Sequence, residues 1–209
     1  NAIFLDCILL FYEFSKFLVQ KGHFVTVICG DSLLGQETPV KSNWLTKEFF
    51  IDGIKVIAVR NSYSNYMGKM RRIISFLKFM LLASVIGLRE KVPEIVYATS
   101  TPLTVGVPAI LLKKLRKVPF VFEVRDLWPE APIQMGFIKN RLLIKGLRKF
   151  EKKIYKEANH VVALSPGMVE GVLSAGISNE KISMIPNCAD LDLFGEKPGK
   201  SEELIAKYS

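Results

Sequence analysis

The stretch FVFEVRDLWPE, from Phe120 to Glu130, decides which fold and which site this chain is expected to have. It opens with an apolar run rich in β-branched and aromatic residues, which is typical of a buried strand. It then ends in charged and aromatic side chains, namely Glu123, Arg125, Asp126, Trp128 and Glu130. Because open parallel α/β sheets bind ligands at the carboxyl ends of their strands, the stretch predicts a functional site on such a sheet.

Two later segments have the same form. VVALSPGM, residues 161–168, and ISMIPNCADLDLF, residues 182–194, each run from an apolar strand into a turn that contains Pro, Ser or Asn. Three such strand exits within about 75 residues predict one shared site. The second and third exits add Ser165 and Asn187 to the candidate residues.

The remaining pattern predicts an α/β fold. Helical periodicity and apolar runs alternate along the chain, with one hairpin signal at Asp52-Gly53. Expected helices are residues 11–21, 68–90, 103–116, 139–158 and 166–175, and expected strands are 23–29, 94–99, 119–124, 160–164 and 181–185. Such alternation is typical of a doubly wound, mostly parallel, Rossmann-like sheet with helices on both faces. A length of 209 residues suits a single domain over residues 1–209.

Through the segments FEVRDLWPE and IPNCAD, residues 12–209 resemble the N-terminal half of the retaining family-4 glycosyltransferases of the two-domain GT-B fold. The likeness is greatest to bacterial enzymes that build capsule, O-antigen or colanic-acid sugars on a lipid carrier. Two positions depart from the family pattern. Arg125 stands where many relatives carry His, and Cys188-Ala189 replaces the Gly-Val of the family's IPNGVD turn.

The resemblance implies an acceptor-side domain. Asp126 would orient the attacking acceptor hydroxyl, and a nucleotide sugar would be the donor in the full-length enzyme, with no metal required. Further acceptor-binding residues implied by the likeness are Glu123, Arg125, Trp128, Glu130, Thr101, Ser165 and Asn187. Two structural alternatives stay open. Arg125 and Asp126 would form a buried pair that closes the strand, and Thr101 or Ser100 would cap a helix whose first residue is Pro102.

Two family motifs are missing from the chain. No Gly precedes Gly22, so the Gly-rich loop after the first strand is either missing or located upstream. No Glu is followed by another Glu eight positions later, so the E-x7-E motif of the donor-binding half does not occur. The C-terminal donor-binding domain is therefore expected to be absent from this chain, and the isolated chain is expected to be inactive and to hold no cofactor.

The net charge of +9 is concentrated in one region. Residues 69–160 contain 19 Lys or Arg and 7 Asp or Glu, whereas the rest of the chain has a small excess of acidic residues. A concentrated basic zone favours an anionic membrane surface or nucleic acid as a partner, and a merely solvated basic face is the alternative. Three widely spaced cysteines without a C-x-x-C pair favour a reducing, cytoplasmic compartment.

The helix expected near residues 68–90 is basic at its start and apolar beyond it. Lys69, Arg71, Arg72 and Lys78 lie where the helix dipole prefers acidic groups, so they are candidates for contact with phosphate head groups. A core-facing helix with solubilising ends is the open alternative. The basic helix expected at 139–158 has an apolar stripe that includes Leu143 and Ile154, and this stripe is expected to pack on the sheet.

These observations predict a glycosyltransferase domain that is peripheral on the inner face of a bacterial membrane. It would act in surface polysaccharide synthesis on a lipid-pyrophosphate-linked saccharide acceptor. The rival hypothesis is a non-catalytic, membrane-associated α/β binding module. Nucleic acid is not an expected partner, because the chain carries none of the recognised nucleic-acid motifs or aromatic stacking patterns.

Overall fold

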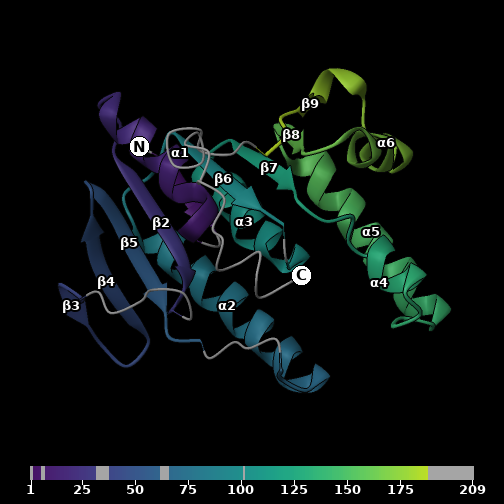
Figure 1. Cartoon of the computed structure of the whole chain (residues 1–209), viewed down its shortest axis with the longest axis horizontal. Helices are drawn as coiled ribbons and strands as arrows, with labels where there is room; N and C mark the ends of the chain where they lie inside the picture. Colours follow the sequence, from purple (N-terminus) through teal and green to yellow (C-terminus); the bar gives the residue numbers. More distant parts are fainter. Residues whose placement is uncertain (1, 6–7, 32–37, 62–65, 101, 188–209) are drawn as a thin grey trace, which may run out of the picture.

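A mostly parallel sheet organises the chain (Figure 1). The computed structural model describes residues 2–5, 8–31, 38–61, 66–100 and 102–187. Within these residues the strand order is β3-β4-β5-β2-β1-β6-β7-β8-β9. The strands are β1 Ala2–Leu5, β2 Val25–Gly30, β3 Lys41–Ser42, β4 Thr46–Ile51, β5 Ile54–Val59, β6 Ile95–Thr99, β7 Phe120–Val124, β8 His160–Ala163 and β9 Ile182–Met184.

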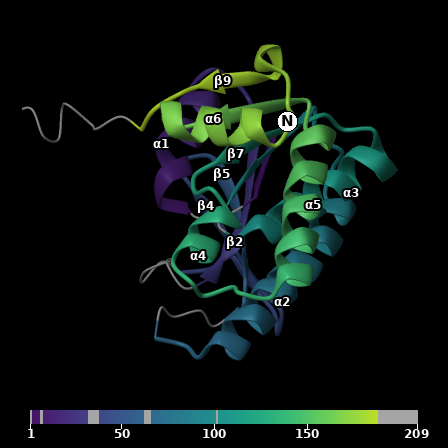
Figure 2. The ribbon, with the colours of Figure 1, turned by 90° about the vertical axis from the view of Figure 1, so that its right-hand side faces the viewer.

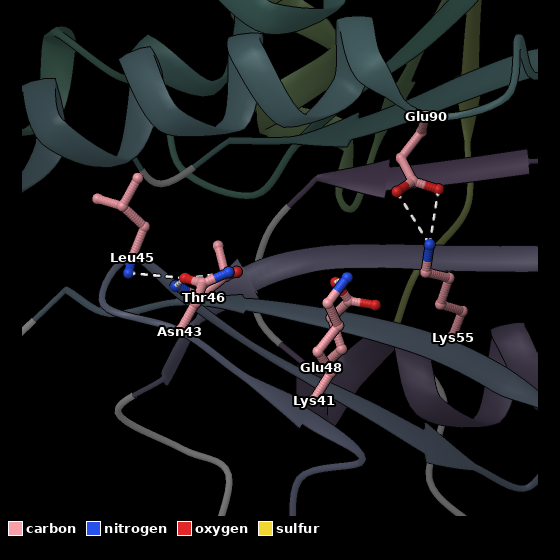
Figure 3. Close-up of polar contacts among 7 residues, drawn as sticks. All are labelled: Lys41, Asn43, Leu45, Thr46, Glu48, Lys55 and Glu90. Carbon is pink, nitrogen blue, oxygen red and sulfur yellow. Dashed lines mark hydrogen bonds and ion pairs between the residues drawn. The ribbon is translucent and has the colours of Figure 1, made fainter.

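Only β3 and β4 run antiparallel to their neighbours among these strands. The β4–β5 hairpin turns at Asp52 and Gly53, whose φ angles of 47° and 81° are typical of a type I′ turn, so this hairpin prediction is confirmed. At the outer edge, Asn43 Oδ1 accepts hydrogen bonds from the backbone N–H groups of Leu45 and Thr46, at 2.8 and 2.7 Å (Figure 3). This side-chain turn closes the β3–β4 connection.

Helices cover both faces of the sheet (Figure 2). The helices are α1 Ile8–Gln20, α2 Lys69–Arg89, α3 Gly106–Arg116, α4 Glu130–Gln134, α5 Arg141–Glu157 and α6 Pro166–Ser174, with short 3-10 turns η2 Leu103–Val105 and η3 Asn179–Lys181. Helix α1 packs on one face, while α2, α3 and α5 share the core of the other face. The predicted α/β class, with a parallel sheet between helices, is confirmed.

The larger core cluster extends along the sheet from β5 and β2 to β6–β8, and it includes residues of helices α2, α3, α5 and α6. Phe122 and Tyr155 are fully buried there, with ring centroids 5.9 Å apart. Helices α3 and α5 approach closely, because a Cβ on Gly106 would lie only 2.7 Å from Ile154 Cδ1. At the far end of α2, Lys55 Nζ of β5 contacts both carboxylate oxygens of Glu90, at 2.9 and 2.8 Å (Figure 3).

Four elements were not predicted from the sequence: β1, β3, α4 and the 3-10 turn η3. Strand β1 occupies the middle of the sheet, and Asp6 and Cys7 alone separate it from α1. The connection between β1 and α1 therefore contains no Gly.

The apolar stripe of α5 packs on the core only toward its end. Ile154 and Tyr155 are buried, whereas Leu143 is exposed by 52%, so the prediction that Leu143 packs on the sheet is wrong. Helical periodicity defines an apolar face, but it does not show how far a partner extends along that face. Helix α2 is apolar too, yet among the described residues no helix meets the length and hydropathy that a membrane crossing needs.

Candidate functional site

The predicted site lies at the topological switch point of the sheet. The chain proceeds from β1 to β2 on one side, and α2 later carries it back across the sheet to β6 on the other side. Open α/β sheets form a crevice at the carboxyl ends of the strands where the direction reverses. Here those strands are β1 and β6, with β7 next to β6. We refer to Thr99, Ser100, Glu123, Arg125 and Asp126 as the switch-point cluster.

Ser100, which follows β6, is hydrogen-bonded to the end of β7. Its backbone N–H donates to the carbonyl of Glu123 at 2.8 Å, and its Oγ accepts from the backbone N–H of Arg125 at 2.9 Å. Ser100 is only 2% exposed. The sequence predicted that Ser100 or Thr101 caps a helix that starts at Pro102. That prediction is wrong for Ser100, because η2 begins at Leu103 with Pro102 as a cap that provides no side-chain hydrogen bond. Thr101 lies outside the described residues.

Glu123 is the buried acid of the cluster. It faces the α1 side of the sheet, where it is paired in register with Thr99. Burial raises the pKa of Glu123, although Thr99, Arg125 and Tyr97 partly oppose that shift. Glu123 Oε2 and Thr99 Oγ1 are both buried without reaching hydrogen-bond geometry with another group. A buried carboxyl group and a buried hydroxyl group thus form a polar floor beneath the loop that follows β7.

Tyr97 completes this floor, and it is not among the site residues predicted from the sequence. Its hydroxyl interacts with Glu123, and burial together with that carboxylate raises the pKa of Tyr97. The Tyr97 ring also contacts Phe14 of α1, at 5.7 Å between centroids. The alternation of Tyr97 and Thr99 with apolar residues in β6 is a signal that places both side chains on one face.

Arg125 and Asp126 stand above the floor. Asp126 is exposed to solvent, and its carbonyl accepts from the backbone N–H of Trp128 at 2.8 Å, which makes the loop turn sharply. Arg125 is half-buried, and its guanidinium favours the charged form of Glu123. An exposed carboxylate beside a cation at the strand exit suits the binding of a ligand with several hydroxyl groups.

The loop then returns to the core. Trp128 is half-buried and packs with Leu127 against the large core cluster. A Cβ on Gly171 of α6 would lie 2.5 Å from Leu127 Cδ2, so α6 seats this loop closely. Glu130 forms an ion pair with Arg148 of α5, at 2.8 Å. Both side chains are largely exposed, so this ion pair positions α4 against α5 with little energy of its own.

Ser165 and Asn187 share the same edge of the sheet. Ser165 follows β8 and caps α6 by accepting from the Met168 N–H at 3.3 Å. Asn187 follows β9 and is exposed. The structure thus places Ser100, Asp126, Ser165 and Asn187 along consecutive strand exits β6 to β9. Residues of the IPNCAD turn from Cys188 onward lie outside the described residues.

The four predicted membrane-contact residues lie in the first half of α2. Arg71 and Lys78 are exposed and Arg72 is half-buried, whereas the Lys69 side chain lies outside the description. Lys78 Nζ donates to the carbonyl of Arg60 at 2.7 Å, which ties α2 to the end of β5.

A shallow depression of about 290 Å³ lies at the opposite, amino-terminal edge of the sheet. Its lining consists of Lys113, Lys114, Lys117, Pro119 and Asn159. The lysines complement the carboxyl end of α3, so this depression is explained without a ligand. Among the described residues, no three His, Cys, Asp or Glu side chains are grouped so as to hold a metal ion.

Solved structures similar to this chain are glycosyltransferases of the GT-B fold and related enzymes. The Anabaena protein Alr3699/HepE, solved with UDP and glucose, has a TM-score of 0.59 and 16% identity over 100% of this chain and 50% of its own. A sucrose-phosphate synthase structure from Thermosynechococcus elongatus has a TM-score of 0.59 and 12% identity, over 93% of this chain and 93% of its own. The calicheamicin glycosyltransferase CalG4 has a TM-score of 0.56 and 13% identity, over 96% of this chain and 55% of its own. The chain thus spans half the length of the Anabaena protein.

Comparison with curated proteins gave no match. A family model described as "Glycosyl transferase 4-like domain" matches residues 11–188, which include every described member of the switch-point cluster and the exits of β8 and β9. The match covers most of the chain and agrees with the GT-B likeness of the fold. The chain therefore belongs to the glycosyl transferase 4-like domain family.

Proposed function

We propose that this chain is the acceptor-side half of a retaining glycosyltransferase that transfers a sugar from a nucleotide sugar to a lipid-pyrophosphate-linked saccharide. The proposed setting is the cytoplasmic face of a bacterial membrane, in the synthesis of capsule, O-antigen or a similar surface polysaccharide. The switch-point cluster carries the proposal, because it presents an exposed carboxylate and a cation at the strand exits of a family-4 domain. The fold and the family support the transferase class.

In the proposed reaction, the bond between the anomeric carbon and the diphosphate breaks, and a bond forms between that carbon and the acceptor oxygen. The acceptor hydroxyl proton passes to an oxygen of the leaving diphosphate. Asp126 accepts a hydrogen bond from a neighbouring hydroxyl of the acceptor sugar and thereby orients the attacking hydroxyl toward the anomeric carbon, while the proton of the attacking hydroxyl stays directed at the diphosphate. Arg125 and Asn187 hold neighbouring acceptor groups, and Ser165 fixes the turn between them. The donor is held mainly by the half of the GT-B fold that this chain does not span.

Replacing Asp126 with Asn tests this role in the full-length enzyme. The variant keeps the side-chain volume and removes the negative charge, so turnover falls on the order of 100- to 10,000-fold while the melting temperature stays close to that of the wild type. The matched control is Glu180→Gln, which removes an exposed carboxylate in η3, at the amino-terminal edge of the sheet. Turnover is measured with a lipid-linked acceptor, and melting is measured on the same preparation.

Two results would contradict the assignment. If Asp126→Asn melts much earlier while its folded fraction turns over at the wild-type rate, Asp126 supports the structure only. If no nucleotide sugar in a panel yields product with either a lipid-linked or a water-soluble acceptor, the transferase proposal itself fails.

A further inference from the structure

We infer that the connection between α4 and α5 is a second membrane contact, which together with α2 turns the carboxyl edge of the sheet toward an anionic bilayer. This inference rests on the proposed function, because a lipid-linked acceptor has to be met at a membrane surface. We call residues 135–143 the α4–α5 shoulder. The membrane contact predicted from the sequence lies in α2 alone.

The shoulder exposes large apolar side chains. Phe137 and Met135 are each exposed by 63%, and Leu142 is exposed by 81%. The start of α5 in this segment has a defined local structure. Asn140 caps α5 by accepting hydrogen bonds from the backbone N–H groups of Leu142 and Leu143, both at 3.0 Å. The cap fixes the first turn of α5, and these leucines remain on its surface.

The sequence in and beside the shoulder carries only positive charges between Glu130 and Glu151. No Asp or Glu occurs between Glu130 and Glu151, whereas this interval contains five Lys or Arg. Helix α5 begins with Arg141 and has no acidic residue in its first turn. A cation at a helix start interacts unfavourably with the helix dipole, so Arg141 does not stabilise α5 through that dipole.

Helix α2 has the same two properties. It buries Phe79 and Ala83 on one side and exposes an apolar stripe on the other. The stripe consists of Met70, Ile73, Ile74, Leu77, Leu81 and Val85. No Asp or Glu occurs between Asp52 and Glu90, and Arg71 lies in the first turn. The spacing of three and four residues makes the stripe continuous along the helix.

Both surfaces lie at one end of the molecule. Helices α2 and α5 pack on the same face of the sheet. Each ends just before the amino end of a parallel strand, β6 or β8, so each starts on the side of the carboxyl edge. In Figure 2 the starts of both helices are in the lower half of the molecule, near α4. That edge also carries the switch-point cluster. A surface that contacts both helix starts therefore faces the candidate site.

The composition identifies an anionic lipid interface as the occupant. The cores of protein–protein interfaces are depleted in Lys, whereas interfacial helices combine large apolar residues with Lys and Arg. Each well-placed cation adds to binding at an acidic membrane surface and loses that effect as salt rises. Residues 69–89 of α2 and residues 131–150, which include the shoulder, together contain ten Lys or Arg and no Asp or Glu.

Vesicle binding by the 209-residue chain tests the inference. Phosphatidylcholine vesicles with phosphatidylglycerol should retain the wild type at low salt, and pure phosphatidylcholine vesicles should not. Phe137→Ser combined with Leu142→Ser should weaken retention about tenfold or more. The matched control is Leu115→Ser, since Leu115 is exposed by 63% and lies among Lys113, Lys114 and Arg116 at the opposite edge of the sheet. It should bind as the wild type does.

Tryptophan quenching measures insertion directly. Phe137→Trp should gain fluorescence that brominated lipids quench, and Leu115→Trp should not. Unchanged retention of the Phe137/Leu142 double variant, or equal quenching at positions 137 and 115, would overturn the second contact. If Arg71→Gln, Arg72→Gln and Lys78→Gln together abolish retention while the shoulder variants do not, α2 is the sole contact. If anionic vesicles do not retain the wild-type chain, the inference is overturned. In that case the transferase proposal still holds if the full-length enzyme transfers a sugar to a water-soluble acceptor.

Discussion

Ser100 is the residue that couples the candidate site to the sheet. Its Oγ accepts a hydrogen bond from the backbone N–H of Arg125, the residue that follows β7. Ser100→Ala leaves that buried N–H without its partner. We expect the free energy of unfolding to fall by about 1–3 kcal/mol, as for other buried donors that lose their acceptor. Denaturant unfolding of the 209-residue chain measures the change.

Ser84→Ala is the matched control for this prediction. Ser84 is also buried, but its Oγ donates a hydrogen bond to the carbonyl of Met80, one turn earlier in the same helix α2. Its loss should change the free energy of unfolding by less than about 0.5 kcal/mol, because Ala favours the helix. Equal losses in the two variants would show that the Ser100 hydroxyl is not specifically required.

At this scale the sequence predicted the positions of Asp126, Ser165 and Asn187 at strand exits, because an apolar run that ends in polar residues marks the place where a buried strand stops. The hydrogen bond of Ser100 was not predictable. It depends on the register between β6 and β7, which brings together residues 25 positions apart. The roles of these residues in acceptor binding stay predictions.

Among the elements, α5 links the site to the core through a polar chain. Arg148 pairs with Glu130 at 2.8 Å. Glu151, about one turn after Arg148, accepts a hydrogen bond from the Tyr155 hydroxyl at 3.0 Å. Burial raises the pKa of Glu151 to about 7; the Tyr155 hydrogen bond opposes this shift, and Glu130 adds to it. The chain therefore contains a carboxyl group that titrates near neutral pH beside the ion pair that holds α4.

The shifted pKa of Glu151 predicts a pH dependence of stability. Its folded-state value of about 7 exceeds the ordinary 4.5, so the folded protein binds this proton more tightly. The contribution is present at low pH, and it is lost as pH rises from about 4.5 through 7. Melting temperatures measured from pH 5 to 8 should therefore fall less steeply for Glu151→Gln than for the wild type. Glu170→Gln, an exposed carboxylate on α6, should keep the wild-type slope.

A Glu151→Gln slope identical to that of the wild type would mean that Glu151 ionises freely in the folded protein. Buried Glu123 contributes in the same direction, since burial raises its pKa too, so Glu151→Gln should reduce the slope without removing it.

The element pattern was predictable where the signal was long. Helices α2, α3 and α5 and the parallel strands β6 to β8 follow from strong periodicity or apolar runs. Helix α4 was missed because it has only five residues and includes Pro132. Strand β1 was missed because four residues carry no readable period. The exposed start of α5 was unpredictable, since a stripe does not specify where its partner ends.

For the whole molecule, the half-length match to the GT-B structures predicts weak donor binding. In the resembling fold the diphosphate is held mainly by the second half, and in this chain the β1–α1 connection lacks glycine. Calorimetric titration of the 209-residue chain with UDP-sugars should give dissociation constants above the low micromolar range. Tighter binding would show that this domain holds the donor by itself. The full-length enzyme serves as the positive control.

The central place of β1 has a consequence for the order of events during synthesis. Ala2 pairs with Val25 of β2 on one side and with Ile95 of β6 on the other. At roughly 5–20 residues per second, the ribosome needs between about 5 and 20 s to proceed from the first strand to its second neighbour. Throughout that interval one edge of β1 has no pairing partner, and unpaired edges recruit other strands. The nascent chain is therefore most exposed to mispairing before residue 95 emerges, which is when a chaperone would protect it most.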